Sequence, residues 1–193
     1  MNDSISMLTA KKKVVLHAGC GGYGRSAIHW SFDRRRWDQI TLDLNPECKP
    51  DVVASITDMR GVDSESVDAV YLSHTLEHVA AHEVPLALAE FLRVLKPDGD
   101  ALIVVPDLKQ ACAVIADDRA EQYLYQSPGG PIAAVDMVFG HREGVRLYGD
   151  CMVHRTGFTE KTLAAALTAA GFIEVNTWVS GYDLYATAQK EAA

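Results

Sequence analysis

Features of membrane-spanning and secreted proteins are missing from this sequence of 193 residues. No apolar run approaches the roughly 20 residues that a bilayer-spanning helix needs. The N-terminus stays polar up to Val14 and shows no signal-peptide core. The four cysteines, Cys20, Cys48, Cys112 and Cys151, are scattered and form neither a C-x-x-C pair nor a disulfide framework. These absences predict a cytoplasmic protein without a membrane partner.

Positive charge is also scarce. The sequence has 18 Lys and Arg against 26 Asp and Glu, a net charge of −8, which disfavours broad binding to nucleic-acid phosphates. The short basic run at 34–36 is typical of a solvated surface. With 48% hydrophobic and 23% charged residues, the composition is that of a globular protein. We therefore expect a single domain over 1–193 and no nucleic-acid partner.

Short apolar runs alternate with helical patterns along most of the chain. Strands are expected at 14–16, 40–44, 52–54, 67–73, 101–105, 172–177 and 182–188. Helices are expected at 25–32, 83–95, 107–125 and 159–170, the last between a Thr159 cap and a Gly171 stop. Such alternation predicts a mostly parallel sheet with helices on both sides, whose ligands bind at the carboxyl ends of the strands.

Glycine and carboxylate residues follow the first three expected strands. Gly19-Cys20-Gly21-Gly22-Tyr23-Gly24 follows the first, and glycine lets a backbone turn tightly and approach a ligand. Asp43 ends the second, where a carboxylate can accept hydrogen bonds from ribose hydroxyls. Asp58, followed by Met59, lies after the third, within reach of a base. The pattern predicts a nucleoside ligand without separating a nicotinamide dinucleotide from S-adenosylmethionine.

Taken in order, these motifs resemble the class I methyltransferases, especially their small type 11 branch. The matching pieces are 14–24, 42–44, 55–59, 66–79, 90–105 and 154–172. The resemblance implies a Rossmann-like fold with a seven-stranded, mostly parallel sheet and helices on both faces. It also implies a methyltransferase with S-adenosylmethionine as cofactor and S-adenosylhomocysteine as product.

The same resemblance assigns the cofactor-binding residues. They are His17, Gly19, Cys20, Gly21, Asp43, Leu44, Asp58, Met59, Ser73 and His74. The glycine segment and Ser73 are expected at the methionine part, Asp43 at the ribose, and Asp58 with Met59 at the adenine. Where the family usually has an acidic residue at the end of the first strand, this chain has His17.

Candidate catalytic residues are those able to take a proton, because a base assists methyl transfer only when the acceptor atom is protonated. His74 is the first candidate, since it lies beside the expected methyl position. His141, Tyr148 and His154 lie in the segment 107–158, which is expected to cover the substrate, while residues 1–12 form an arm. A structural hydrogen-bonding role is an equal alternative for each. We expect a small-molecule acceptor, methylated at oxygen or nitrogen, and leave a homodimer open.

Other interpretations of the same residues are weaker. A short-chain dehydrogenase needs Tyr-x-x-x-Lys, and no tyrosine here has a lysine four places on. His17 leaves open a catalytically inactive methyltransferase-like module that partners another protein. The segment from His74 through Glu77 to His78 spells H-x-x-E-H, a pattern of zinc peptidases. The segment directly follows an expected buried strand, and those peptidases are far larger. A divalent ion held by His74, Glu77 and His78 is a milder alternative, but helix capping and pocket polarity explain the cluster more simply, so no metal ligand is predicted.

Overall fold

The fold is centred on a seven-stranded sheet. The computed structural model describes residues 11–193, so all but the end of the expected arm lies outside the described residues. The strands stand in the order β3-β2-β1-β4-β5-β9-β8, and only β9 runs antiparallel to its neighbours. They are β1 (Lys13–Ala18), β2 (Trp37–Asp43), β3 (Val52–Val53), β4 (Val67–Ser73), β5 (Leu95–Pro106), β8 (Ile173–Ser180) and β9 (Asp183–Gln189). The expected strands and the mostly parallel sheet are confirmed.

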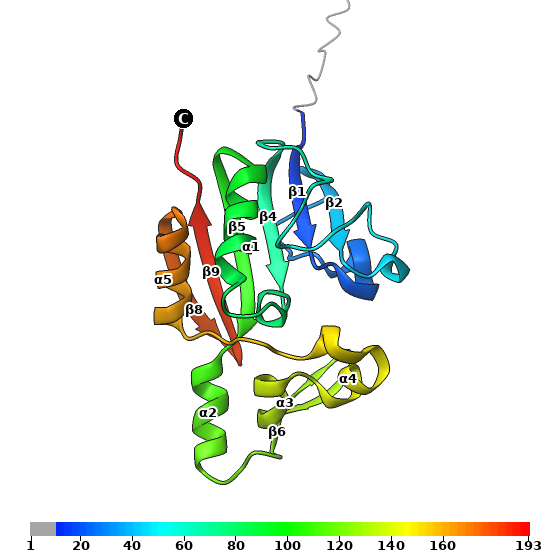
Figure 1. The fold of residues 1–193 in the computed structure, drawn as a ribbon, viewed down its shortest axis with the longest axis vertical. Helices are drawn as coiled ribbons and strands as arrows, with labels where there is room; N and C mark the ends of the chain where they lie inside the picture. Colours follow the sequence, from blue (N-terminus) through cyan, green and yellow to red (C-terminus); the bar gives the residue numbers. More distant parts are fainter. Residues whose placement is uncertain (1–10) are drawn as a thin grey trace, which may run out of the picture.

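One face of the sheet carries the main core under α1 (Val84–Val94) and α5 (Glu160–Ala170), as Figure 1 shows. In α1, Val84, Leu88 and Phe91 recur at helical spacing and are buried, which explains why this segment folds as a helix on the sheet. Burying side chains such as Leu88 and Phe91 contributes about 2 to 3 kcal/mol each. The packing on this face holds β4 and β5 in place, and the candidate site lies next to the carboxyl ends of these two strands.

Helix α5 ends where the sequence indicates. The Thr159 side chain accepts a hydrogen bond from the Thr162 amide at its N-terminus. At its C-terminus Gly171 adopts a φ of +106°, a left-handed conformation that glycine takes without strain. Both predicted caps are confirmed.

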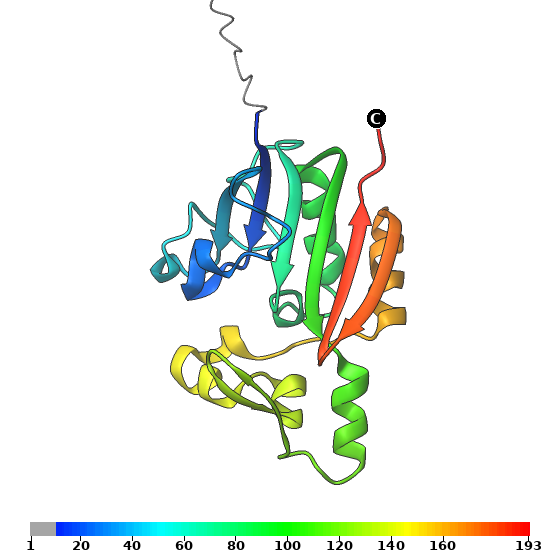
Figure 2. The ribbon, with the colours of Figure 1, turned by 180° about the vertical axis from the view of Figure 1, so that it is seen from behind.

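The opposite face has a thinner cover, seen in Figure 2. It consists of the 3-10 helix η1 (Gly21–Ala27) and the segment after it, whose Phe32 packs on Val15 and Tyr71. The predicted helix over 25–32 is therefore wrong. Gly24 (φ 50°, ψ −127°) interrupts the helical conformation, and the chain is already extended at Ile28. The predicted helical cover of this face is reduced to η1.

Residues 107–158 form a substructure of their own beyond the carboxyl ends of the parallel strands (Figures 1 and 2). It contains α2 (Leu108–Ala116), β6 (Tyr123–Ser127), β7 (Gly130–Ala133), α3 (Ala134–Phe139), α4 (Arg142–Tyr148) and the 3-10 helix η4 (Gly149–Met152). We call it the excursion. The helix expected over 107–125 ends at Ala116, and Tyr123 already pairs in the β6–β7 hairpin.

Candidate active site

The glycine loop after β1 is shaped by Gly19 and Gly21. Both have a positive φ, +71° and +56°. A Cβ on Gly19 would lie 2.2 Å from Thr75 Oγ1, so only glycine lets the loop pack against the segment after β4. A Cβ on Gly21 would meet nothing within 4 Å. The loop thus packs against Thr75 at Gly19, whereas the space beside Gly21 is unoccupied by protein atoms.

Asp43 ties this loop to the end of β2. Its Oδ2 accepts a hydrogen bond of 2.7 Å from the Gly21 amide, and its Oδ1 accepts one of 2.9 Å from the Asn45 amide. The Gly19 and Cys20 amides donate to the Leu42 carbonyl. Each Asp43 oxygen keeps a free lone pair, because an ionised carboxylate offers about four acceptor sites. The predicted ribose residue and the predicted glycine loop are brought together.

His17 and Cys20 are buried beside the loop. His17 is 2% exposed, its Nδ1 lies 3.1 Å from Gln39 Nε2, and its ring centroid lies 4.9 Å from that of Tyr71. Burial, partly offset by the charge of Asp43, lowers the pKa of His17 to about 4. Burial and the nearby Asp43 raise the pKa of the Cys20 thiol to about 11, so it is not a nucleophile at neutral pH. Cofactor contacts of either side chain stay predictions.

The residues predicted at the adenine differ in access. Leu44 is 65% exposed just after β2, and Asp58 is half-exposed and pairs with Arg60 at 2.6 Å. Met59 lies entirely within the main core, and its amide donates to Glu90. A contact between the Met59 side chain and a base would therefore require that side chain to move. Leu44 and Asp58 offer the accessible surface.

A polar cluster follows β4, the strand that ends at Ser73. His74 has a φ of +49°, and its amide donates to the Val104 carbonyl of β5. Its Nδ1 lies 3.6 Å from Glu77 Oε1 and its Nε2 lies 3.4 Å from Asp183 Oδ1. The imidazole therefore stands between two carboxylates, one on η3 (Leu76–His78) and one at the start of β9.

His154 joins this cluster from the end of the excursion. Its Nε2 lies 3.9 Å from Glu77 Oε1, and its ring centroid lies 4.9 Å from that of His78. The amides of Arg155 and Thr156 donate to the Glu77 carbonyl, so the end of the excursion is fastened to η3. The structure thus brings together two of the predicted catalytic residues, His74 and His154.

The charges in the cluster are strongly coupled. Burial lowers the pKa of His74, but the neighbouring Glu77 carboxylate and the charge of Asp183 outweigh it and raise that pKa above its ordinary value. Burial raises the pKa of Glu77, and the surrounding histidines outweigh it, so the carboxylate is ionised at neutral pH. Burial holds the pKa of His154 below its usual range, and burial raises that of Asp183.

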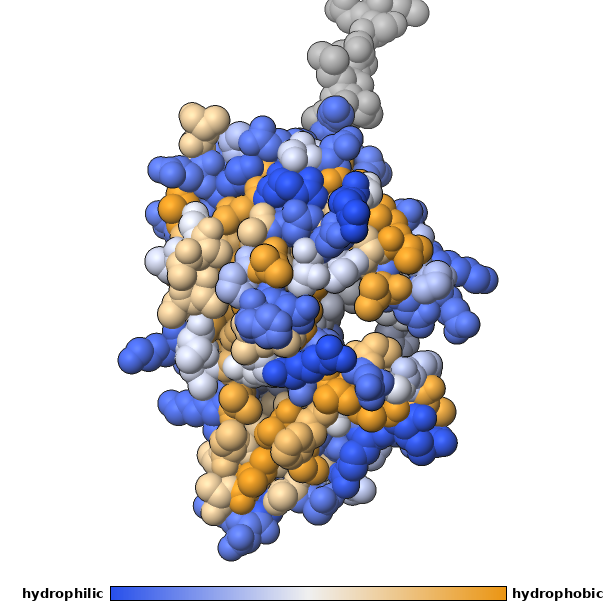
Figure 3. Space-filling view, in the orientation of Figure 1, coloured by the Kyte–Doolittle hydropathy of each residue, from blue (hydrophilic) through white to orange (hydrophobic). Residues whose placement is uncertain are grey.

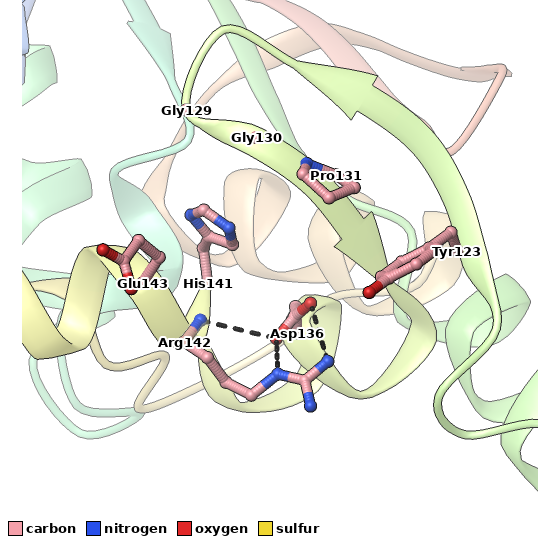
Figure 4. A pocket seen from close by; sticks show the side chains of 8 residues that line it. All are labelled: Tyr123, Gly129, Gly130, Pro131, Asp136, His141, Arg142 and Glu143. Carbon is pink, nitrogen blue, oxygen red and sulfur yellow. Dashed lines mark hydrogen bonds and ion pairs between the residues drawn. The ribbon is translucent and has the colours of Figure 1, made fainter.

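The two other predicted catalytic residues lie elsewhere. His141 lines a separate hollow of about 270 Å³ on the excursion. Figure 4 shows its ring there beside Arg142, which is bound to Asp136. Tyr148 is 65% exposed at the end of α4. Neither residue is among the partners of the His74 cluster, and their catalytic roles stay predictions.

Sequence reasoning missed Asp183. It is 109 positions from His74, and only the direction of the last strand reveals it. Because β9 is antiparallel, its first residue lies at the edge where the parallel strands end, and Asp183 pairs with Pro106 at the end of β5. Tyr182, just before it, stacks on Tyr125 of the excursion with a centroid distance of 5.8 Å. An opening lies between the end of the sheet and the excursion (Figure 3).

The model of a methyltransferase-domain family matches residues 16–103. The match spans the glycine loop, Asp43, Asp58 and the segment from Ser73 to His78. Residues 16–103 therefore have the sequence pattern of a methyltransferase domain. The predictions of an S-adenosylmethionine-dependent methyltransferase and of this cofactor are confirmed at the level of this domain. No curated protein sequence matches the chain.

Solved structures share the fold of this methyltransferase. The 1,6-didemethyltoxoflavin-N1-methyltransferase of Burkholderia thailandensis, which holds 1,6-didemethyltoxoflavin and S-adenosylhomocysteine, is 20% identical with a TM-score of 0.57, covering 94% of this chain and 72% of that one. An S-adenosylmethionine-dependent methyltransferase of Methanosarcina mazei is 16% identical with a TM-score of 0.61 and 94% coverage of both chains. A methyltransferase of Haloferax volcanii, in complex with the activator Trm112, is 15% identical with a TM-score of 0.59, covering 94% of this chain and 84% of that one.

These likenesses confirm the Rossmann-like class I fold. The described helices of this methyltransferase include none that is long and apolar enough to cross a membrane.

Proposed function

We propose that this methyltransferase transfers a methyl group to an oxygen or nitrogen atom of a small-molecule acceptor, held between the sheet and the excursion. The observation that carries the proposal is the position of His74. It directly follows β4, its imidazole stands between Glu77 and Asp183, and the excursion contributes His154 to the same cluster. A polar group able to move a proton is thus available at the strand end where the family carries out its chemistry.

The residues around the glycine loop fit S-adenosylmethionine. The free lone pairs of Asp43 suit ribose hydroxyls, and the space at Gly21 lets the backbone approach a ligand. Leu44 and Asp58 offer surface for the adenine, and Ser73 with His74 borders the methionine part. When bound, the cofactor supplies a methyl group on a sulfonium, which is an excellent leaving group.

The protein's own contribution is then mainly to position the acceptor. Glu77 and Asp183 orient the His74 ring from opposite sides. In the proposed reaction His74 takes the proton that the acceptor atom loses as its new bond to carbon forms. His154, through Glu77, supports that ring, whereas His141 and Tyr148 remain on the outer part of the excursion.

Aromatic side chains between the excursion and the sheet favour a small, planar acceptor. The stacked pair of Tyr125 and Tyr182 lies where the excursion meets the sheet, and aromatic faces bind flat rings well. The net charge of −8 disfavours a nucleic-acid acceptor. The toxoflavin precursor enzyme acts on a small molecule by its description. A cytoplasmic location, predicted from the scattered cysteines, is part of the same proposal, and a homodimer stays open.

An acceptor screen tests this function. The purified chain is incubated with methyl-labelled S-adenosylmethionine and with phenols, catechols or nitrogen heterocycles, and in parallel with transfer RNA or protein. We expect label in at least one small molecule, none in the macromolecules, and loss of the labelled product with Asp43→Ala. Label that appears in RNA or protein alone would contradict the proposal.

A further inference from the structure

Glu77 is an unusual residue for a protein core. Its side chain is 1% exposed, and within residues 11–193 its two oxygens are the buried side-chain polar atoms without a hydrogen-bond partner. The nearest His74 nitrogen, at 3.6 Å, is too far for a hydrogen bond. A buried carboxylate is costly unless it is paired or coordinates a cation. Beyond the ion-pair contact with His74, both Glu77 oxygens therefore keep lone pairs for a further positive partner.

Two histidines beside this carboxylate are held through Nδ1. His78 Nδ1 lies 3.2 Å from the Val153 carbonyl, and His154 Nδ1 lies 3.0 Å from the Met137 carbonyl. A carbonyl oxygen only accepts, so each Nδ1 carries the proton and donates it. In this tautomer Nε2 is the ring nitrogen that can bind a metal ion. Metal-bound histidines are held by this same second contact, which fixes tautomer and orientation.

The three ligand atoms converge. One carboxylate oxygen of Glu77 and one ring nitrogen each of His78 and His154 lie within 4.8 Å of one another. Ligands around zinc stand about 2.0 to 2.2 Å from the ion, so modest side-chain movements would close the site. We propose that Glu77, His78 and His154 bind one divalent transition-metal ion, of which zinc is the representative.

The donor set decides the class of metal. Imidazole ligands suit zinc, iron and nickel, whereas magnesium takes oxygen ligands in a near-octahedral arrangement. Two imidazoles and one carboxylate also leave coordination positions open, as in catalytic metal sites.

Such an ion would also join two parts of the fold. Glu77 and His78 belong to η3, which follows β4, and His154 belongs to the end of the excursion. A bound ion adds a cross-link beside the amide bonds from Arg155 and Thr156 to the Glu77 carbonyl. The inference does not depend on methyl transfer, because it concerns binding and stability alone.

The test uses the full, tag-free chain after treatment with a chelator. Zinc chloride is titrated by calorimetry, and cobalt(II) is added as a spectroscopic probe with visible absorption. We expect one ion per chain and a rise of several degrees in the unfolding temperature with zinc. In Glu77→Gln and His154→Ala we expect the affinity for zinc to fall by at least about 100-fold, since even changes outside the ligand set cost 10- to 100-fold. The exposed His82→Ala is the matched control and should bind as the wild type does.

X-ray absorption of the zinc-loaded wild type keeps the test independent of variant folding. Two imidazole nitrogens with oxygen ligands and no sulfur are expected. A wild-type chain that binds no zinc would overturn the inference and leave Glu77 as the counter-ion of His74. Zinc bound equally by wild type and folded Glu77→Gln, or bound through cysteine sulfur, would overturn it as well.

Discussion

His17 illustrates how one residue sets a pH response. The ring is buried between Gln39 and Tyr71, and its pKa of about 4 keeps it neutral over the whole physiological range. The same side chain replaces the acidic residue that the family usually has at this point. We therefore expect protonation of His17 to change the free energy of unfolding.

We predict that His17 makes the folded state less stable as the pH falls. The folded pKa lies below the unfolded value of 6.5, so the unfolded chain binds more protons between these values. Its contribution should fall by about 2 kcal/mol from pH 7 to pH 5. Urea unfolding of the wild type and His17→Gln at both pH values measures it, with the exposed His82→Gln as control. Parallel pH slopes for wild type and His17→Gln would show that His17 does not cause the effect.

His74 is the residue on which the proposed chemistry depends. We predict that His74→Ala lowers turnover by about 100-fold or more, a typical effect of losing a proton acceptor, while S-adenosylhomocysteine binds nearly as before. Steady-state kinetics with the identified acceptor and calorimetry with the product separate the two. Unchanged turnover would reduce His74 to a scaffold residue.

At the scale of elements, the sequence indicates segments whose local pattern agrees with their packing. The run at 67–73 and the capped helix before Gly171 are found where they are expected. Prediction fails where a local conformation interrupts a continuous pattern. The chain becomes extended at Ile28, inside the helix expected over 25–32, and the chain after Ala116 turns through Asp118 at φ +59° into a hairpin. Neither interruption is visible in hydrophobic spacing alone.

The glycine loop offers an element-scale prediction. Gly19→Ala places a methyl group 2.2 Å from Thr75 Oγ1 at a positive φ, whereas Gly21→Ala has the φ strain without the overlap. We expect a loss of about 1 kcal/mol for Gly21→Ala and about 2 kcal/mol or more for Gly19→Ala. Thermal unfolding of both variants gives the comparison. Equal losses would mean that the contact with Thr75 does not limit the loop.

At the scale of the whole molecule, the site is assembled from distant parts of the chain. The residues predicted to bind the cofactor lie in segments that follow parallel strands, a placement that the local sequence patterns indicate. The His74 cluster could be predicted only in part. Asp183 reaches it through the reversed last strand and His154 through the return of the excursion. The positions of Asp183 and His154 depend on the topology of the chain, which local sequence patterns do not contain. The separation of His141 from the cluster depends on topology as well.

The central claim is that S-adenosyl compounds bind across the ends of β1 and β2, with Asp43 holding the ribose. Calorimetric titration of S-adenosylhomocysteine into wild type, Asp43→Ala and Asp38→Ala tests it most directly. Asp38 is the matched control, since it lies on β2 far from Asp43 and pairs only with Lys12 among the described residues. The account predicts binding by wild type and Asp38→Ala and none by a folded Asp43→Ala. Full affinity in Asp43→Ala, or no binding by the wild type, would contradict it.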